Sequence, residues 1–524
     1  MKIRSALLCA ALAAGMVALV PPGATAATVR HEAETAPATC AGTIDANHAG
    51  YTGTGFCNAA NAVGSAARFS VSAPAAGTAT ITVRYANGGT AGRPADLLVN
   101  GARVTSLAFA GTGTWTGWTP ATATVPVVAG ANVIRLSPTT SAGLPNVDHL
   151  EVTTTEAASS ALYVATTGDD AAAGTLAAPL RTIQAAVDRA TPGTTIHVRG
   201  GTYAPAGNIQ LVKDGTAGRP YTLTAYAGER VVIDGENMPY TPGAVGSSIP
   251  RAARGAVHVE GDHWRVAGLE IVHGPYGVFG VDTNHGVYDR LVTRDNYESG
   301  LHLQGASSGN QILDLDSSGN RDPRKNGESA DGVAIKEGSG AGNVIRGARL
   351  WNNSDDGLDL WEFTSPVLTE SSLAWGNGYN RWDIPGYTGD GNGFKLGGGD
   401  PDPAADHVTR NSMAWDNSAH GFTDNGNPGS LLVERGTAWR NGRTGFDLAD
   451  STSTLTRNLA VANETPVALG AGSGGSGNSW DLGGTWDLVS TDRSAITGAR
   501  TSGGAIPSSA FLRPADGADV GARF

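Results

Sequence analysis

The chain has 524 residues, of which 74 are Gly, 16% are charged and 40% are hydrophobic. Gly is about twice as frequent as usual, which disfavours a helical protein because Gly is costly inside helices. No Gly-X-Y period runs through the chain, so a collagen-like fold is excluded. The formal charge of −12 argues against nucleic acid or an anionic membrane as a partner. The length and composition predict two or more domains of all-β architecture.

Residues 1–26 have the features of a secretory signal peptide. Lys2 and Arg4 form its positive end, an apolar stretch follows, and Ala24-Thr25-Ala26 supplies small residues for cleavage. The apolar stretch is too short to span a membrane, and no other segment reaches the required ~20 residues. We therefore expect a secreted, extracellular protein with no membrane contact. Its formal charge becomes −14 once Lys2 and Arg4 are removed.

Residues 28–154 alternate apolar and polar positions between frequent turns. Strands this short and regular predict a β-sandwich of antiparallel sheets. Cys40 and Cys57 lie in this region, and outside the cell we expect them to form one disulfide, with two free thiols as the alternative. Residues 155–160 are small or polar and form a short linker to the next domain.

From residue 161 onward the chain repeats itself. A helix predicted over 180–190 would cap the open end of the repeat. Successive Gly residues each begin a Gly-apolar unit: Gly255, Gly277, Gly300, Gly332, Gly357, Gly393 and Gly445. A Trp-x-Asn unit recurs in phase at Trp351, Trp375, Trp415 and Trp439. Two patterns with a period near 24 residues predict a parallel β-helix over 161–524, with Asn side chains stacked from coil to coil.

One coil is longer than its neighbours. The spacing between the two repeats places an insertion of about 12 residues within 376–392, just before Lys395. The insertion carries Tyr379, Arg381, Trp382 and Tyr387. A long loop on a rigid scaffold is a usual place for substrate contacts, although a solvated loop without function is the alternative.

Four carboxylates are expected at one corner of the β-helix. Asp355, Asp356 and Asp359 fall within five residues, and Asp331 precedes Asp355 by one coil. Such a group would repel strongly if left empty. A hard cation relieves the repulsion, and calcium is the one that best accepts several oxygen ligands. The alternative is an acidic edge exposed to solvent.

Alignment of the repeats places Lys395 at the position of Asp359, one coil along. Lys395 is either an ion-pair partner of Asp359 or a general base whose pKa a nearby cation lowers. Calcium beside a lysine suits the β-elimination of a uronate. The cation neutralises the sugar carboxylate, the lysine removes the C5 proton, and the C4 oxygen leaves.

Three separated motifs resemble those of polysaccharide lyase family 9, and the resemblance covers roughly 161–524. They are Glu328-Ser-Ala-Asp331-Gly-Val-Ala-Ile-Lys336, Asn353-Ser-Asp-Asp-Gly-Leu-Asp359 and Gly391-Asn-Gly-Phe-Lys-Leu-Gly-Gly398. The resemblance implies a right-handed parallel β-helix with calcium-dependent pectate lyase activity. It implies calcium ligands at Asp331, Asp355, Asp356 and Asp359, and a base at Lys395. Lys336 and Arg381 are further candidates for contacts with a pectic polysaccharide.

Residues 28–154 resemble carbohydrate-binding modules of families 35 and 6. The matching segments include His31-Glu-Ala-Glu34, Gly50-Tyr-Thr-Gly-Thr-Gly55, Trp115-Thr-Gly-Trp118 and Asn146-Val-Asp-His-Leu150. The resemblance implies a structural calcium held by Glu32, Glu34 and Asp148. Ligand contacts are expected from loop residues: Tyr51, Arg93, Trp115 and Asn146. Aromatic faces stack on sugar rings, and Arg pairs with a uronate.

Two other functions are compatible with parts of the pattern. A β-helix hydrolase acting on pectin would use paired Asp residues to activate water, without calcium. It would also need a Gly-His-Gly motif, which only Asn284-His-Gly286 and Ala419-His-Gly421 approach. A non-catalytic, calcium-stabilised binding solenoid is the second alternative, but it would have no need of Lys395. In each case we expect a monomer.

Overall fold

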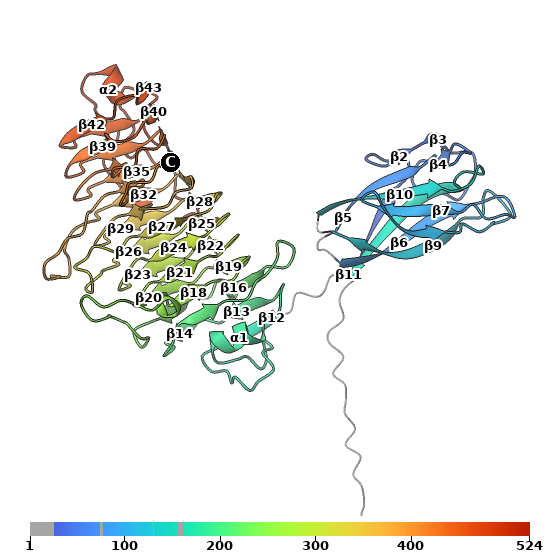
Figure 1. The fold of residues 1–524 in the computed structure, drawn as a ribbon, viewed down its shortest axis with the longest axis horizontal. Helices are drawn as coiled ribbons and strands as arrows, with labels where there is room; N and C mark the ends of the chain where they lie inside the picture. Colours follow the sequence, from blue (N-terminus) through green and yellow to red (C-terminus); the bar gives the residue numbers. More distant parts are fainter. Residues whose placement is uncertain (1–25, 74–76, 129, 156–160) are drawn as a thin grey trace, which may run out of the picture. The chain divides into compact units, whose positions relative to one another are not determined.

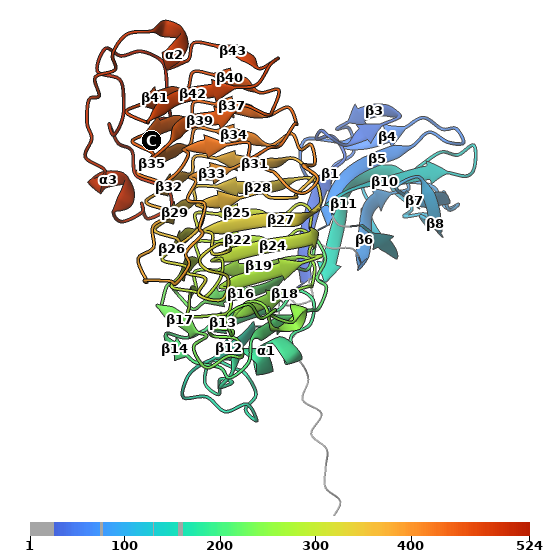
Figure 2. The same ribbon diagram turned by 60° about the vertical axis from the view of Figure 1, so that its left-hand side comes forward.

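The computed structural model describes residues 26–73, 77–128, 130–155 and 161–524. The predicted signal peptide and the predicted linker lie almost wholly outside these residues. The chain forms two compact units, Met1–Ser159 and Ser160–Phe524 (Figures 1 and 2). Within the described part of the chain, no helix is both long enough and apolar enough to cross a membrane.

The N-terminal unit is a sandwich of two antiparallel sheets. One sheet comprises β1 (Ala26–Glu32), β3 (Gly42–Asp45), β4 (Phe56–Ala59), β6 (Gly77–Ala86), β9 (Thr119–Val127) and β11 (Asn146–Thr155). The other comprises β2 (Thr39–Cys40), β5 (Ala67–Ala73), β7 (Ala95–Val99), β8 (Ala102–Leu107) and β10 (Gly130–Pro138). In β5 buried and exposed residues alternate along the whole strand, as a sheet with one face on the core requires. A disulfide joins Cys40 in β2 to Cys57 in β4, which confirms the predicted pair.

The second unit is a parallel β-helix in which three sheets run along the stack of coils. The first sheet contains β12 (Ala161–Val164), β13 (Thr195–Val198), β16 (Tyr221–Ala225), β19 (Trp264–Ala267), β22 (Val287–Asp289), β25 (Gln311–Leu313), β28 (Asn343–Arg346), β31 (Val367–Glu370), β34 (Val408–Arg410), β37 (Leu432–Glu434), β40 (Thr454–Thr456) and β43 (Gly474–Ser476). The second contains β14 (Gly201–Tyr203), β17 (Val231–Asp234), β20 (Glu270–Val272), β23 (Val292–Arg294), β26 (Asp316–Ser318), β29 (Arg349–Trp351), β32 (Leu373–Trp375), β35 (Met413–Trp415), β38 (Thr437–Trp439) and β41 (Leu459–Val461). The third contains β15 (Ile209–Leu211), β18 (Val257–Val259), β21 (Val278–Val281), β24 (Leu301–Ala306), β27 (Val333–Ser339), β30 (Leu358–Asp359), β33 (Phe394–Lys395), β36 (Phe422–Thr423), β39 (Thr444–Leu448) and β42 (Thr465–Leu469).

A short helix, α1 (Ile183–Arg189), covers the first coils of the β-helix beside β12 and β13 (Figure 1). The helix was predicted over 180–190, and it begins later because the Thr182 hydroxyl caps it by accepting a hydrogen bond from the Ala185 amide. At its other end the Lys213 ammonium donates to the carbonyls of Val187, Asp188 and Ala190. The remaining helices are short: a 3-10 turn (Arg251–Ala253), α2 (Ser479–Leu482) and α3 (Ser494–Thr497).

The repeated Gly is required by the close approach of neighbouring coils. A Cβ at Gly357 would lie 2.5 Å from the carbonyl oxygen of Gly393 on the next coil. The backbone there does not adopt a left-handed conformation, so the space between coils, rather than an unusual dihedral angle, selects Gly. Any side chain at this position would force the coils apart.

Two side-chain stacks hold the coils together. Asn amides hydrogen-bond from coil to coil, as predicted, and the stack runs through Asn296, Asn320, Asn353, Asn377, Asn417, Asn441 and Asn463. The rings of Trp351 and Trp375 are parallel with centroids 4.9 Å apart, as are those of Trp375 and Trp415. Phe511, in the segment after the last coil, packs edge-on against Trp415. The segment therefore covers part of the Trp stack.

Candidate active site

The third sheet aligns the candidate site residues across successive coils. Asp359 in β30 pairs in register with Lys395 in β33, which confirms their predicted alignment. The same row continues through Ala334 in β27 to His302 in β24. Because parallel strands lie about 4.8 Å apart, this row sets the spacing of functional groups along the molecule.

Three of the four predicted carboxylates converge beside this row. Asp331, Asp355 and Asp356 are buried, and one oxygen of each lies within 4.8 Å of the others. Asp355 and Asp356 lie on the bend between β29 and β30, so their side chains need not point to opposite faces as they would in a straight strand. Val333 pairs with Leu358, so Asp331 aligns with Asp356 rather than with Asp355. The prediction was one residue off because this coil is 25 residues long.

The cluster is arranged to accept a cation. Burial raises the pKa of Asp355 and Asp356 well above the usual range, and the charge of Asp356 adds to the effect at Asp355. Burial also raises the pKa of Asp331. The Oδ2 atom of Asp356 is buried and accepts no hydrogen bond. Buried, converging carboxylates, one of which has an oxygen that accepts no hydrogen bond, fit a hard divalent cation such as calcium.

Asp359 lies outside this group and is held by a lysine. The Lys336 ammonium is 2.6 Å from the Asp359 carboxylate and 3.2 Å from that of Asp331. Desolvation opposes ionisation of Asp359, but Lys336 and Lys395 outweigh it and lower the pKa of Asp359 to about 2. Asp359 is therefore a permanent anion between two cations. Lys336, predicted as a substrate contact, also anchors the cluster.

Lys395 is 7% exposed and surrounded by acids. Its Nζ donates a 2.9 Å hydrogen bond to Asp390 and lies 3.5 Å from Asp356 and 3.9 Å from Asp359. Desolvation would lower the pKa of Lys395, but Asp359, Asp356, Asp355 and Asp390 together raise it well above the usual range. In this state the amine is protonated. Neutralising part of this negative charge would lower the pKa of Lys395.

The inserted loop, 376–392, folds back over the carboxylates. The Tyr387 hydroxyl donates to the Ser354 carbonyl, and the Asp390 amide donates to Asp355 at 2.7 Å. The Asn392 amide donates to Asp356 at 2.6 Å. The loop thus orients two carboxylates and supplies Asp390 as a partner of Lys395. Arg381 instead lies over the Tyr379 ring, 5.1 Å from its centroid.

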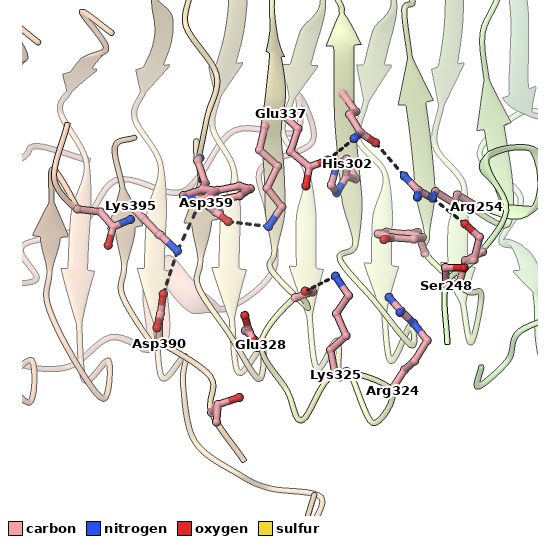
Figure 3. A pocket seen from close by; sticks show the side chains of 18 residues that line it. Ser248, Arg254, His302, Arg324, Lys325, Glu328, Glu337, Asp359, Asp390 and Lys395 are labelled. Carbon is pink, nitrogen blue, oxygen red and sulfur yellow. Dashed lines mark hydrogen bonds and ion pairs between the residues drawn. The ribbon is translucent and has the colours of Figure 1, made fainter. Parts of the chain in front are cut away.

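A groove of about 750 Å³ runs along the third sheet (Figure 3). Lys395 and Asp390 lie at one end, and Arg254 and Ser248 lie at the other. The groove is lined by Ser248, Ile249, Arg254, Tyr276, His302, Gln304, Arg324, Lys325, Glu328, Ser329, Lys336, Glu337, Asp359, Trp361, Thr388, Asp390, Lys395 and Asn425. Arg381 is not among these residues. An elongated, strongly polar groove is suited to an extended, charged polymer.

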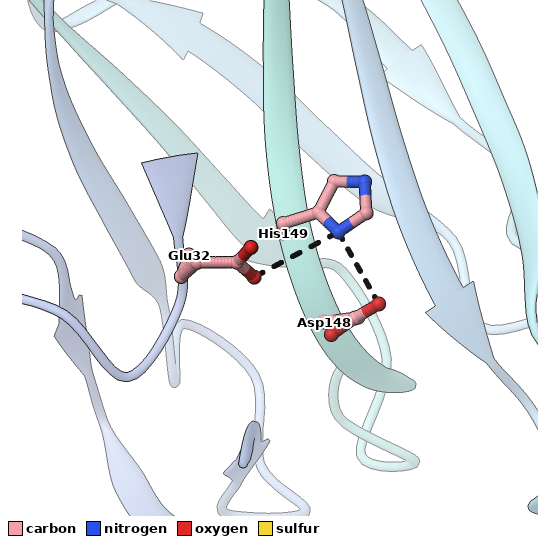
Figure 4. A group of neighbouring side chains, drawn as sticks. All are labelled: Glu32, Asp148 and His149. Atoms are coloured by element: carbon pink, nitrogen blue, oxygen red, sulfur yellow. Dashed lines mark ion pairs between the residues drawn. The ribbon is translucent and has the colours of Figure 1, made fainter. Parts of the chain in front are cut away.

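A second group of possible metal ligands lies in the N-terminal unit (Figure 4). Glu32, Asp148 and His149 bring one ligand atom each within 4.8 Å of the others. The Thr52 hydroxyl lies 2.9 Å from Glu32 and 2.8 Å from His149. Asp148 also pairs with Arg84. His149 was not predicted as a ligand, although the motif that contains Asp148 includes it.

Glu34 lies near this group without joining it. Its Oε1 atom accepts a hydrogen bond from the Thr54 amide at 2.8 Å, and its buried Oε2 atom accepts none. A Cβ at Gly53 would lie 2.0 Å from Glu34 Oε1 and 3.5 Å from the Glu32 carboxyl carbon. Gly53 therefore leaves open the space beside the Glu32 and Glu34 carboxylates. Carboxylate oxygens around an open space fit a calcium ion.

The predicted sugar contacts of the N-terminal unit gather only in part. Arg93 lies over the Trp115 ring at 5.2 Å, and the His48 ring stacks on Trp115 with centroids 5.9 Å apart. Tyr51 reaches the cluster through Phe56, which His48 also contacts. Asn146 begins β11 and is buried, and none of these ring contacts involves it. The Tyr51 ring is partly exposed and offers an apolar face of the kind that sugars stack on, whereas Arg93 and His48 lie against the Trp115 ring.

Comparison with known proteins explains this arrangement. Residues 162–463 match the family model "Pel9A-like, right handed beta helix region". The chain belongs to the Pel9A-like family. Pectate lyase PEL9 of Emericella nidulans is 51% identical to it over 384 residues, which cover 69% of this chain and 94% of that protein.

Solved structures agree with this assignment. The crystal structure of pectate lyase Pel9A matches this Pel9A-like protein with a TM-score of 0.59 and 30% identity, over 68% of this chain and 89% of that one. A rhamnogalacturonan lyase matches with a TM-score of 0.59 and 25% identity, over 68% and 96%. Residues 29–155 match the model of carbohydrate binding module family 35. The predicted fold class is confirmed, as are the predicted lyase family of the β-helix and the predicted family 35 of the N-terminal module. The match to the N-terminal unit is to family 35 and not to family 6, the other predicted family.

Several residues of the Pel9A-like site were not predicted from the sequence. Asp390 and Asn392 belong to the insertion, which interrupts the repeat, so no register could place them. Arg254 and His302 lie outside the three segments that resemble family motifs. The spacing of His302 two residues after the repeat Gly300 matches that of Asp359 and Lys395 after theirs, and this signal could have placed it in the row.

Proposed function

We propose that the protein is a secreted, calcium-dependent pectate lyase that cleaves polygalacturonate, or a related uronate-containing polymer, by β-elimination. One observation carries the proposal: a buried carboxylate cluster lies beside a buried lysine on the floor of a long groove. Membership of the Pel9A-like family supports it. The enzyme is accordingly a polysaccharide lyase, not a hydrolase.

The calcium would be held by Asp331, Asp355 and Asp356, with Asp359 at the edge of the group. When bound, calcium neutralises the carboxylate of the sugar and so acidifies the adjacent C5 proton. The backbone amides of Asp390 and Asn392 fix one oxygen each of Asp355 and Asp356, which leaves the other oxygens for a ligand. Lys336 holds Asp359 in place during binding.

Lys395 is the proposed base. Its neutral amine takes the C5 proton, the C5–H electrons form the C4=C5 double bond, and the C4–O bond breaks toward the leaving sugar. The product carries an unsaturated sugar end, and no water is added. Because acids raise the pKa of Lys395, neutral amine is scarce at low pH, and activity is expected to increase toward alkaline pH.

The N-terminal unit would bind carbohydrate and hold a structural calcium. Glu32 and Asp148 would supply carboxylates, with Glu34 across the space at Gly53 and with Thr52 and His149 beside them. Stacking on Trp115 and pairing with Arg93 would favour a uronate-containing ligand. The disulfide between Cys40 and Cys57 is consistent with an oxidising, extracellular location.

The test follows ultraviolet absorbance of unsaturated product from polygalacturonate, with calcium or with chelator. Calcium-dependent absorbance is expected, whereas new reducing ends without absorbance would mean hydrolysis. Lys395→Ala and Lys395→Arg should each lose about 10²- to 10⁴-fold in rate. The Arg variant keeps the positive charge among the acids but cannot become neutral, so it separates the base from an ion-pair role. Activity retained in the Arg variant would overturn the assignment.

A second polymer is favoured by one observation. A rhamnogalacturonan lyase shares this fold over 68% of the chain. Running the same assay on rhamnogalacturonan decides between the polymers. Faster release of unsaturated product from rhamnogalacturonan than from polygalacturonate would reassign the substrate while leaving the chemistry of Lys395 unchanged.

A further inference from the structure

His302 is a buried histidine on the floor of the groove with unused hydrogen-bonding capacity. Its side chain is 4% exposed, and neither ring nitrogen has a hydrogen-bond partner among the described residues. The ring is stacked on Phe279 at 4.9 Å and meets Tyr276 edge-on at 5.4 Å. Burial lowers its pKa well below the usual value, with Lys336 and Arg254 adding to the effect. The ring is therefore neutral, with one donor and one acceptor.

An unpartnered buried polar group is costly, so such groups normally find a partner in the working protein. His302 lines the groove, and Figure 3 shows it between Asp359 and Arg254, away from Lys395. A sugar hydroxyl both donates and accepts, and it therefore matches a neutral imidazole. The rings of Phe279 and Tyr276 hold the imidazole in one orientation.

Arg254 supplies a positive charge beside His302. It donates to the Ile249 carbonyl at 3.1 Å and to the Gln304 amide oxygen at 3.0 Å, and it lies over the Phe279 ring at 5.3 Å. No carboxylate among the described residues lies within ion-pair distance of it. An uncompensated, half-buried guanidinium in a groove is suited to bind a carboxylate.

We propose that His302 and Arg254 form a distal subsite that binds one uronate unit of the polymer, with Arg254 on its carboxylate and His302 on a hydroxyl. The subsite is three strand spacings, about 14 Å, from Lys395 along the row Asp359, Ala334 and His302. That distance exceeds one pyranose ring, so the distal unit is separate from the one that reacts. The inference rests on the proposed function, whose substrate it describes.

Binding measured in a non-cleaving background tests the subsite directly. Titration calorimetry with an oligogalacturonide octamer and with a dimer is carried out on Lys395→Ala. Arg254→Gln and His302→Phe are then added separately to that background. Phe preserves the stacking on Phe279 and removes both nitrogens. Arg254→Gln should weaken octamer binding about tenfold to a hundredfold, and His302→Phe about twofold to tenfold.

The control is Arg230→Gln, which removes one positive charge from an exposed side chain outside the groove. It should leave octamer affinity within about twofold of the background, as expected for a screened surface charge. Dimer affinity should decrease less than octamer affinity in the two groove variants, because a dimer reaches only one end of the groove and can occupy the end beside Lys395 without contacting Arg254 or His302.

Three results would overturn the inference: octamer affinity unchanged in both groove variants, dimer affinity lowered as much as octamer affinity, or no octamer binding by the background. Failure of the proposed function is recognised separately. It would appear as the absence of unsaturated product from any pectic polymer with the unaltered enzyme, whatever the binding ratios are. A melting temperature measured for each variant confirms that Arg254→Gln and His302→Phe are folded.

Discussion

Asp390 offers a way to test whether Lys395 acts as a base. The Asp390 carboxylate accepts a 2.9 Å hydrogen bond from Lys395, and its side chain is 49% exposed, unlike the other acids around the amine. Asp390 is one of four carboxylates that raise the pKa of Lys395. Removing its charge in Asp390→Asn therefore lowers this pKa, and the neutral amine is populated at lower pH.

The solvent exposure of Asp390 limits how far its removal can lower the pKa of Lys395. An ion pair with one solvent-exposed partner contributes at most about 1 kcal/mol. One pH unit corresponds to about 1.36 kcal/mol, so the pKa of Lys395 should decrease by up to about 0.7 unit. The rising limb of the plot of kcat/KM against pH should move toward lower pH by the same amount.

The assay is the initial rate of unsaturated product at saturating calcium, measured across a pH series. Asp383→Asn is the matched control because Asp383 is exposed on the same inserted loop and has no ion pair within the described residues. In the control variant the rising limb of the plot of kcat/KM against pH should stay at the same pH as in the unaltered enzyme. A limb that stays fixed in Asp390→Asn, or that moves to higher pH, would refute the assignment of Lys395 as the titrating base.

Two further predictions concern the cation and the scaffold. Asp356→Asn should weaken calcium binding about tenfold or more in titration calorimetry, and in the unaltered enzyme the affinity should decrease as pH falls, since protons compete for carboxylates whose pKa is raised. Equal calcium affinity in the variant, or affinity independent of pH, would contradict the proposed site. Asn377→Ala breaks the Asn stack and leaves the Asn353 amide without its partner, so it should lower the free energy of unfolding of the β-helix by about 3 kcal/mol in denaturant titration. Unchanged stability would show that the stack is not a stabilising element.

Local repetition explains what the sequence could predict. Gly357 and Gly393 share a position that admits no Cβ, so the same residue returns once per coil and reveals the register. That register placed Lys395 beside Asp359, because parallel strands keep equivalent residues in one row. Asp331 was placed one residue away from its true partner, since a single extra residue in a coil shifts the row.

Contacts outside the repeat could not be predicted in the same way. Lys336 bridges Asp331 and Asp359 because its long side chain crosses from one coil to the next. The spacing of residues in the sequence does not show how far a side chain extends between coils. Asp390 arrives from an insertion whose path depends on where Tyr387 packs. Arg254 is recognised as a candidate binding residue because no carboxylate of the described residues pairs with it. The absence of a pairing partner can be read only from the three-dimensional structure.

The stacks of Asn and Trp have a consequence for how such an enzyme changes over time. The strand ladders and the Asn stack join each coil to its direct neighbours, so a duplicated coil could be accommodated wherever its Asn continues the stack. A copy placed between β24 and β27 would keep Lys395 in register with Asp359 and His302 stacked on Phe279, while moving Lys395 and His302 about 4.8 Å further apart. The length of sugar chain that the groove holds can therefore change by copying whole coils, with no alteration to any residue that touches the polymer.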